Sequence, residues 1–284
     1  MEAPAIRPRS AIEIVDVAFS IFRSNFATMA VIGLAASVPF VILISLGVFS
    51  MASLSPRSLE ASMMAMLPML VTVGLVAVLW MSVIDGAMTF AAAEAYHGNR
   101  PSPGDAIRGA LSKGISLVGG NVLRVLIIGA VALLMGVGIA VLGKLNAFLG
   151  FIVAVALLVL FVHVIARTFA ITSAIVIERK DAMDGVSRSF ALSRDSTLRI
   201  IGVGFLCLCV YWVAQVAGAL VVQLVIGFIL RNPIVAAIIG NLVGMLMYPF
   251  LNIALMVLYF DQRVRKEGYD IDVLSSAMAP APQS

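Results

Sequence analysis

Long apolar runs constrain this chain more than any other feature. An α-helix needs about 20 apolar residues to cross a hydrocarbon layer of about 30 Å, and such runs recur along the whole sequence. We therefore expect an all-α fold, a polytopic membrane bundle of about six transmembrane helices. The expected spans are residues 27–52, 66–93, 117–142, 146–170, 198–229 and 234–260.

Composition argues against a water-soluble fold. Only 12% of the 284 residues are charged, against about 25% in soluble domains, and the mean hydropathy is +1.09. So few polar side chains could not cover a globular surface. We expect a single membrane domain, with a cytoplasmic interfacial helix at 1–26, a six-span bundle at 27–262 and a cytoplasmic tail at 263–284.

The distribution of basic residues predicts how the bundle is oriented. Sixteen of the 19 Lys and Arg residues fall on one side of the expected membrane, and only Arg57, Lys144 and Arg231 fall on the other. Because cytoplasmic loops are enriched in Lys and Arg, both termini are expected in the cytoplasm, in a cell inner membrane. The net charge of +4 then indicates contact with anionic lipid rather than with nucleic acid.

Residues 12–26 have the pattern of an amphipathic helix. Charged residues occupy one face, and apolar residues recur on the other at helical spacing. This pattern predicts an interfacial helix that leads into the first span; the alternative is a helix that binds a partner protein. Residues 103–115 and 182–194 have a similar character. The apolar face at 12–26 consists of Ile12, Val15, Phe19, Phe22 and Phe26.

A shift of 79 residues reveals a candidate internal repeat. The repeat unit would be an amphipathic helix followed by a two-span hairpin, used three times, with any symmetry axis along the membrane normal. Chance similarity between apolar segments is the alternative. The matching residues are Ala87, Thr89, Phe90, Ala91, Ala95, Arg100 and Asp105 with Ala166, Thr168, Phe169, Ala170, Ala174, Arg179 and Asp184.

The sequence lacks the usual residues of catalytic chemistry. The motifs HExxH, CxxC, GxxxxGK[ST], GxGxxG and GxSxG are all absent, and there are two histidines, so we expect no enzyme, metal site or cofactor. Cys207 and Cys209 point in different directions along a helix and are expected to be buried structural thiols. Glu178 and Asp181 lie among basic residues and are expected to form solvated ion pairs.

Small residues and prolines predict features of helix packing. Gly240 with Gly244, Ala214 with Gly218, and a heptad series of glycines in the third span would let helices approach closely within the chain. The series consists of Gly129, Gly136 and Gly143. Pro39 and Pro249 are expected to kink the first and last spans.

A few polar side chains lie within the expected spans. Near the outer ends of three spans lie Leu67, Leu145 and Ile234, and Asp85, His163 and Asn252 follow them by 18 residues each. This separation is about 27 Å at about 1.5 Å per residue. Arg167 lies one helical turn beyond His163. We expect the four to form an inward-facing cluster in which His163 or Arg167 pairs with Asp85. It would be a binding or proton-linked site open to the cytoplasm, or a pairing that fixes helix register, or separate side chains that reach the interface.

The end of the last span carries a charged motif. Asp261, Arg263, Arg265 and Glu267 alternate just beyond the apolar run. They are expected to pair with the charged cytoplasmic helices or with lipid phosphates. The alternative is an ordinary charged cap on the span.

This motif, which reads YxDxRxRxEGxD, carries a family resemblance together with two other segments, IVDVAF at 14–19 and AMDGVSRSF at 182–190. The chain resembles the membrane-domain family of glycerophosphoryl diester phosphodiesterases and the related six-span bacterial inner-membrane proteins of the YciC type. The resemblance implies an inner-membrane module of poorly known role. In fused members the phosphodiesterase is a separate TIM barrel with a His-Arg pair, and this chain has no such dipeptide.

We therefore expect a non-enzymatic integral membrane module that acts as a scaffold, a partner or an envelope-associated factor, with an unknown protein partner. The alternative is a transporter or channel for a small or lipid-derived solute. A transporter should show a polar cavity at mid-membrane depth, whereas a scaffold should copurify with a partner.

Overall fold

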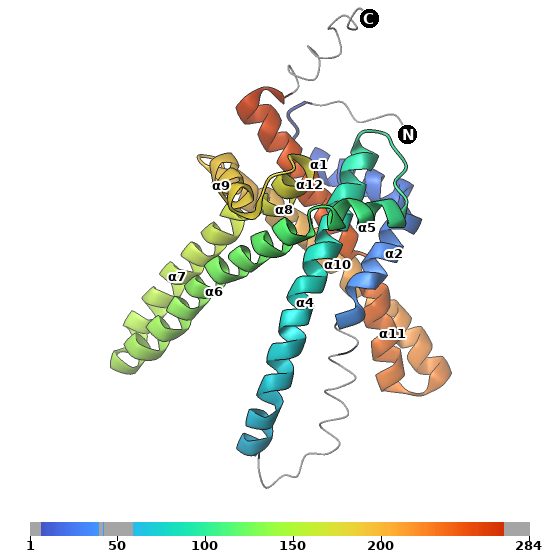
Figure 1. The fold of residues 1–284 in the computed structure, drawn as a ribbon. Coiled ribbons are helices and arrows are strands. Elements are labelled where there is room, and N and C mark those ends of the chain that lie inside the picture. Colours follow the sequence, from blue (N-terminus) through green and yellow to red (C-terminus); the bar gives the residue numbers. More distant parts are fainter. Residues whose placement is uncertain (1–6, 40–41, 43–58, 270–284) are drawn as a thin grey trace, which may run out of the picture.

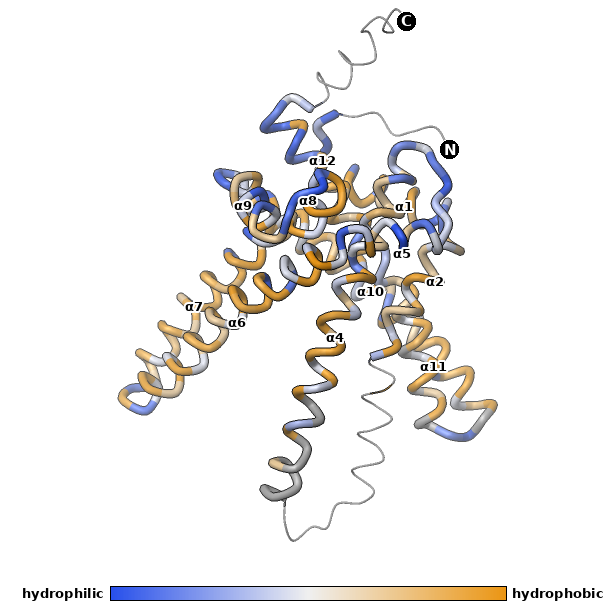
Figure 2. The backbone as a smooth tube through the Cα atoms, viewed as in Figure 1, coloured by the Kyte–Doolittle hydropathy of each residue, from blue (hydrophilic) through white to orange (hydrophobic). Residues whose placement is uncertain are grey.

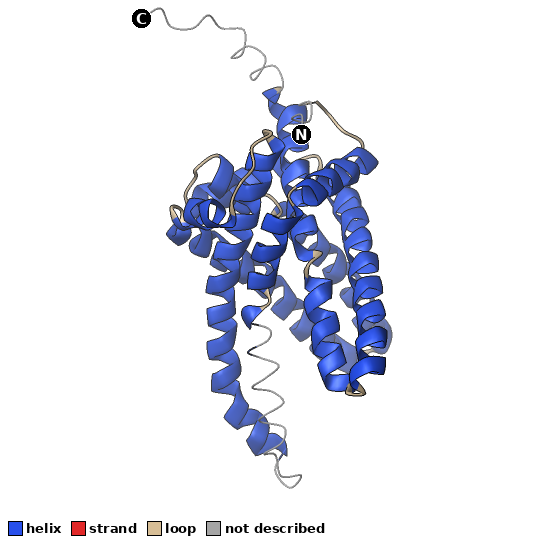
Figure 3. Ribbon diagram, turned by 90° about the vertical axis from the view of Figure 1, so that its right-hand side faces the viewer, coloured by secondary structure: helices blue, strands red, loops and turns tan. Residues whose placement is uncertain are grey.

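The computed structural model of the chain describes residues 7–39, 42 and 59–269, and its regular elements are all helices, as expected (Figure 3). In chain order the helices are α1 (Ala11–Ser24), α2 (Phe26–Ala36), α4 (Leu59–Tyr96), α5 (Pro103–Leu111), α6 (Gly114–Leu145), α7 (Ala147–Arg167), α8 (Ile171–Ile177), α9 (Ala182–Ser193), α10 (Thr197–Leu230), α11 (Pro233–Met245) and α12 (Tyr248–Glu267).

Several of these helices have the length and composition of membrane spans. Five are long and apolar enough to cross a membrane, and α1 with α2 would add a sixth if that bent pair is one span. The chain is therefore polytopic by composition. The part of the first expected span beyond residue 42, and Arg57 on the expected outer side, lie outside the described residues.

The helices are arranged as arms that extend from one packed end (Figure 1). We call this end the collar; it contains α1, α5, α8, α9 and the part of α12 from Asp261 onward. Helix α4, the α6–α7 hairpin and the α10–α11 hairpin diverge from it as arms. The arms are mainly hydrophobic, and the most hydrophilic segments lie at the collar and at the hairpin tips (Figure 2).

The hydrophobic core lies along α12, where this helix approaches the collar. Phe250 and Phe260 of α12 are buried in one cluster with Ile14 of α1 and Met88 of α4. Tyr259 is buried in a smaller cluster with Leu192 of α9. Burying one such side chain contributes about 1.5–3 kcal/mol. In the last candidate span, Ile238–Glu267, half of the apolar stretch is buried, against 6% in the spans that contain α6, α7 and α10. The last span therefore holds the collar and the arms together.

Helix α1 confirms the expected amphipathic helix and corrects its faces. The Ser10 hydroxyl accepts from the Glu13 backbone N–H while the Glu13 carboxylate accepts from the Ser10 N–H, a capping box that starts the helix. The chain bends by 93° between α1 and α2. The face that packs on the protein contains Ile14, Ala18, Ile21 and Phe22, whereas Ile12 and Phe19 of the predicted face are exposed at 68% and 48%. The helix has an inner and an outer apolar face.

Proline positions agree with breaks in the first and last spans. Helix α2 ends at Ala36, before Pro39, and the last expected span is divided into α11 and α12 by a turn that precedes Pro249. Pro249 occupies the first turn of α12, where its missing N–H costs no helical hydrogen bond. Pro68, in contrast, lies inside α4.

The predicted packing of small residues holds at one site and fails at others. A Cβ on Gly240 would lie 2.9 Å from the Ala219 carbonyl oxygen of α10, so α10 and α11 need a glycine there. Cβ atoms on Gly129, Gly136 or Gly218 would meet no atom of the described residues within 4 Å, so these three glycines mark no close helix contact in that part of the chain. Cys207 is buried as expected, but Cys209 is exposed.

The order of elements fits the expected repeat unit. Helices α5 and α9 begin at Pro103 and Ala182, the same 79-residue offset found in the sequence. Each is followed directly by a long helix that starts an antiparallel pair, α6 with α7 and α10 with α11. Helix α1 likewise precedes α2 and α4, although α2 has only 11 residues.

Candidate functional site

Asp85 is the centre of a polar layer just outside the collar. It lies on α4 and accepts a hydrogen bond of 2.7 Å from the Tyr248 hydroxyl. Tyr248 is also hydrogen-bonded to Asn252, one turn later on α12. The break before α12 places Tyr248 at a helix start, so its ring can turn towards α4. Asp85 and Asn252 of the predicted cluster are therefore brought together, through a tyrosine that the sequence analysis did not include.

Arg124 of α6 supplies the positive charge of this layer. It lies close enough to Asp85 for an electrostatic interaction, yet it forms no ion pair within 4.0 Å with any carboxylate of the described residues. One terminal nitrogen donates to the Thr172 hydroxyl of α8 over 2.9 Å, while the Nε atom is enclosed without a hydrogen-bond partner. One turn earlier, the Asn121 amide donates to Ser82 of α4 over 3.0 Å.

The other two residues of the predicted cluster lie elsewhere. Arg167 donates to the Phe190 carbonyl of α9 over 3.2 Å and lies over the Phe190 ring at 4.8 Å. His163 is exposed on α7, an arm that diverges from α4 (Figure 1). The expected pairing of Asp85 with His163 or Arg167 is therefore wrong, because α7 packs on α6 instead of on α4, and Arg124 takes that place.

The C-terminal motif forms the first of two charged networks in the collar. The Asp261 side chain is 1% exposed and accepts from Arg199 over 2.7 Å, from Arg265 over 3.0 Å and from the backbone N–H of Arg9 over 2.7 Å. Arg199 and Arg265 also donate to the Arg9 carbonyl. Asp261 therefore joins the start of α10, α12 and the segment before α1. Glu267 of the same motif pairs with Arg188 of α9, so the motif does pair with a charged collar helix and is not a simple cap.

The second network surrounds Glu178 at the end of α8. Its carboxylate accepts from Arg188 of α9 over 2.7 and 2.9 Å and from the Tyr259 hydroxyl of α12. Arg188 also pairs with Glu267, and Arg263 lies 3.5 Å from Glu178. The expected solvated pair is therefore wrong for Glu178, whose side chain is only 14% exposed.

The second network changes the ionisation of its members. Burial by itself raises the pKa of the Glu178 carboxyl, but the hydrogen bonds from Arg188 and Tyr259 and the nearby positive charges outweigh it, so the pKa lies below its usual value. The hydrogen bond to Glu267 raises the pKa of Arg188, which burial lowers and the contact with Glu178 raises further. Both groups are therefore held in their charged forms.

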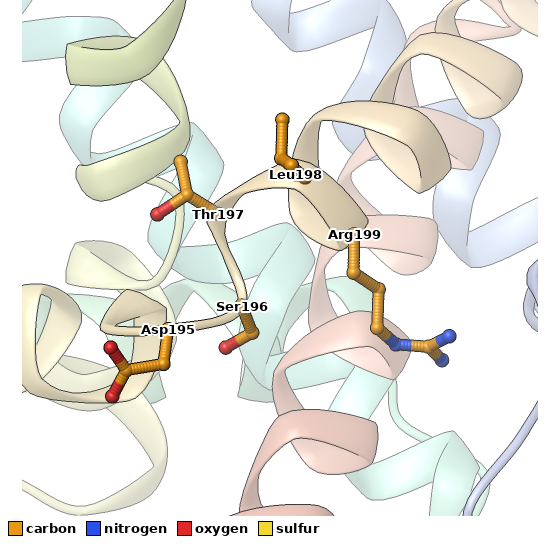
Figure 4. Close-up of a pocket in the computed structure, with 5 residues that line it drawn as sticks. All are labelled: Asp195, Ser196, Thr197, Leu198 and Arg199. Carbon is orange, nitrogen blue, oxygen red and sulfur yellow. The ribbon is translucent and has the colours of Figure 1, made fainter.

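Two cavities accompany these groups. One of about 240 Å³ lies among the arms and is lined by Ala36, Met81, Tyr211, Met245 and Tyr248. A second, of about 500 Å³, lies at the turn from α9 to α10, where the Arg199 side chain points to the opposite side from Asp195 (Figure 4). Since Arg199 is bound to Asp261, the second cavity has no free cation. No group of three potential metal ligands occurs among the described side chains.

The residues that the sequence analysis missed do carry signals. Arg124 is the only charged residue between Gly114 and Gly143, so its position alone marks it as a charge inside a span that needs a partner. Tyr248 precedes Asn252 by one turn. Arg188 and Glu178 are ten residues apart and have no periodic relation, so only the packing of α9 on α8 reveals their contact.

Comparisons with known proteins give no relative for this chain. No family model, no curated protein and no solved structure matches it.

Proposed function

We propose that this chain is a non-enzymatic integral membrane module that acts as a scaffold or partner protein in a cell inner membrane. The observation that supports it is the use of the charged groups of the motif. Asp261 is bound to Arg199 at the start of α10, and Glu267 is bound to Arg188 of α9, so these charges hold the collar in shape and fix it to an arm. An acid–base enzyme would instead direct such groups into an open site.

The orientation and lipid contacts are part of this proposal. The collar faces the cytoplasm, together with both termini, because the collar and the segments that adjoin it carry most of the basic residues. The exposed side chains of Ile12 and Phe19 lie in the head-group region, and neighbouring arginines contact anionic lipid. The family resemblance and the threefold helix-plus-hairpin repeat are further proposals; the matching starts of α5 and α9 support the repeat.

Copurification tests the scaffold. The protein, purified in mild detergent, should retain the same partner in the wild type and in an Asp195→Asn variant, and lose it in a variant that disrupts the collar, Asp261→Asn. Purification of the wild type without any stoichiometric partner from its native membrane would contradict the proposal. Thiol labelling of Lys144→Cys and Arg231→Cys in intact cells, in a background without Cys207 and Cys209, tests the orientation; labelling of Ser10→Cys instead would reverse it.

A transporter is the second candidate, because one cavity adjoins a polar group. The 240 Å³ cavity shares Tyr248 with the Asp85 hydrogen bond, which places an acceptor beside a hollow between the arms. A small solute that binds there should raise the unfolding temperature, and Asp85→Asn should abolish the increase. A scaffold should show no such dependence on any solute.

A further inference from the structure

The polar layer around Asp85 contains unused hydrogen-bonding capacity. Arg124 has five N–H donors, and one hydrogen bond to Thr172 is all that the described residues supply. The Oδ1 atom of Asp85 accepts from Tyr248, while Oδ2 has no partner in the same part of the chain. An unsatisfied guanidinium in a spanning helix is costly, so this layer is incomplete without another group.

The depth of Arg124 indicates what that group is. Helix α6 has 32 residues, which is about 48 Å at about 1.5 Å per residue and exceeds a hydrocarbon layer of about 30 Å. About 20 residues counted back from Lys144, at the tip of the hairpin, reach Arg124. The guanidinium therefore lies at the edge of the hydrocarbon on the collar side, which is the level of lipid phosphates.

The neighbouring cavity supplies the apolar half of the site. Met81 and Asp85 are one turn apart on the same face of α4, and Met81 and Tyr248 both line the 240 Å³ cavity. Because α4 runs towards the collar, the cavity is on the membrane side of Asp85. The site therefore has a polar end at Arg124 and Asp85 and an apolar end at Met81. A phospholipid in the leaflet on the collar side has the same orientation.

We propose that the layer between α4, α6 and α12 binds one phospholipid molecule. Arg124 takes the phosphate in charge-assisted hydrogen bonds, and Asp85 accepts from a donor on the head group. One acyl chain enters the cavity beside Met81 and Tyr248. As an acceptor beyond the phosphate position, Asp85 selects head groups that carry a further donor, an ammonium or a hydroxyl, over phosphatidic acid, which has no group beyond its phosphate. This site is independent of the proposed scaffold role.

Lipid binding to the purified full-length chain tests the proposal. The probes are dioleoyl phosphatidylethanolamine, dioleoyl phosphatidylglycerol, dioleoyl phosphatidic acid and inorganic phosphate, and native mass spectrometry with a thermal shift gives the affinity. We expect one tightly bound ethanolamine or glycerol lipid and no stabilisation by inorganic phosphate. Arg124→Gln should weaken binding at least about tenfold, whereas the exposed collar arginine Arg108 should tolerate Gln without loss.

Two further variants separate binding from folding. Asp85→Asn should remove the preference over phosphatidic acid, a change that a merely structural role would not cause. Met81→Trp fills the cavity and leaves Arg124 intact, so this variant should lose the lipid. It tests the site independently if Arg124→Gln fails to fold. Equal lipid retention by Arg124→Gln and Arg108→Gln, unimpaired binding in Met81→Trp, or stabilisation by inorganic phosphate alone would overturn the proposal.

Discussion

The Asp261 network allows a quantitative prediction for Asp261→Asn. The carboxylate is 1% exposed and receives two arginines and a backbone N–H. Removal of one member of a buried ion pair costs about 3–5 kcal/mol because the partner charges stay uncompensated. Arg199 and Arg265 are about a third exposed and can be partly hydrated, so the lower end applies. We expect a loss of about 3 kcal/mol in the free energy of unfolding.

Thermal unfolding in detergent, followed by the fluorescence of Trp80 and Trp212, measures this loss. A destabilisation of about 3 kcal/mol lowers Tm by about 6–12 °C if each 1 kcal/mol lowers it by about 2–4 °C. Asp195→Asn is the matched control, because Asp195 is exposed and lies 4.0 Å from Arg194; such surface pairs are worth about 0–1 kcal/mol. The double variant Asp261→Asn with Arg199→Gln should lose less than the sum of the single losses. Equal Tm values for Asp261→Asn and Asp195→Asn would refute this reasoning.

Three other predictions concern the second network, the first helix and the α10–α11 contact. The lowered pKa of Glu178 gives stability that is complete above its unfolded pKa of about 4.3 and is lost as the pH falls through the folded pKa. Glu178→Gln should therefore lower Tm at pH 7 and make Tm fall less steeply below about pH 4.3. An unchanged dependence of Tm on acid pH would contradict this. Ser10→Ala removes the N-cap of α1 and should cost about 1 kcal/mol in thermal unfolding, while Ser10→Asp should cost little. Gly240→Ala should lower Tm because its Cβ would lie 2.9 Å from a backbone oxygen, whereas Gly129→Ala meets no neighbour and should not; a stable Gly240→Ala protein would show that α11 is free to move.

The sequence predicts the elements of this fold well because their signals are local. Apolar length sets the spans, and the expected span at 198–229 appears as Thr197–Leu230. A capping serine marks the start of α1, and Pro249 marks the break in the last span. Each signal operates within one or two helical turns, so no tertiary information is needed.

The partners of the polar residues could not be predicted in the same way. Equal depth along separate spans placed Asp85 and His163 at one level, but depth does not say which helices are neighbours. The contact of Asp85 with Tyr248 spans 163 residues of sequence, and it depends on α12 packing against α4. Helix α7 pairs with α6 and is turned away from α4. His163 on α7 is therefore separated from Asp85 on α4.

The contact between Arg9 and Asp261 has a consequence for the order of assembly. It joins residues separated by 252 positions, and the last span is the one that passes through the core. During synthesis, the segment around Arg9 leaves the ribosome long before its acceptor exists, so the first helix must wait with its backbone unpaired. Closure of the collar is therefore a late step of biogenesis, and a chain interrupted before α12 would expose this open state to the quality-control proteases of the membrane.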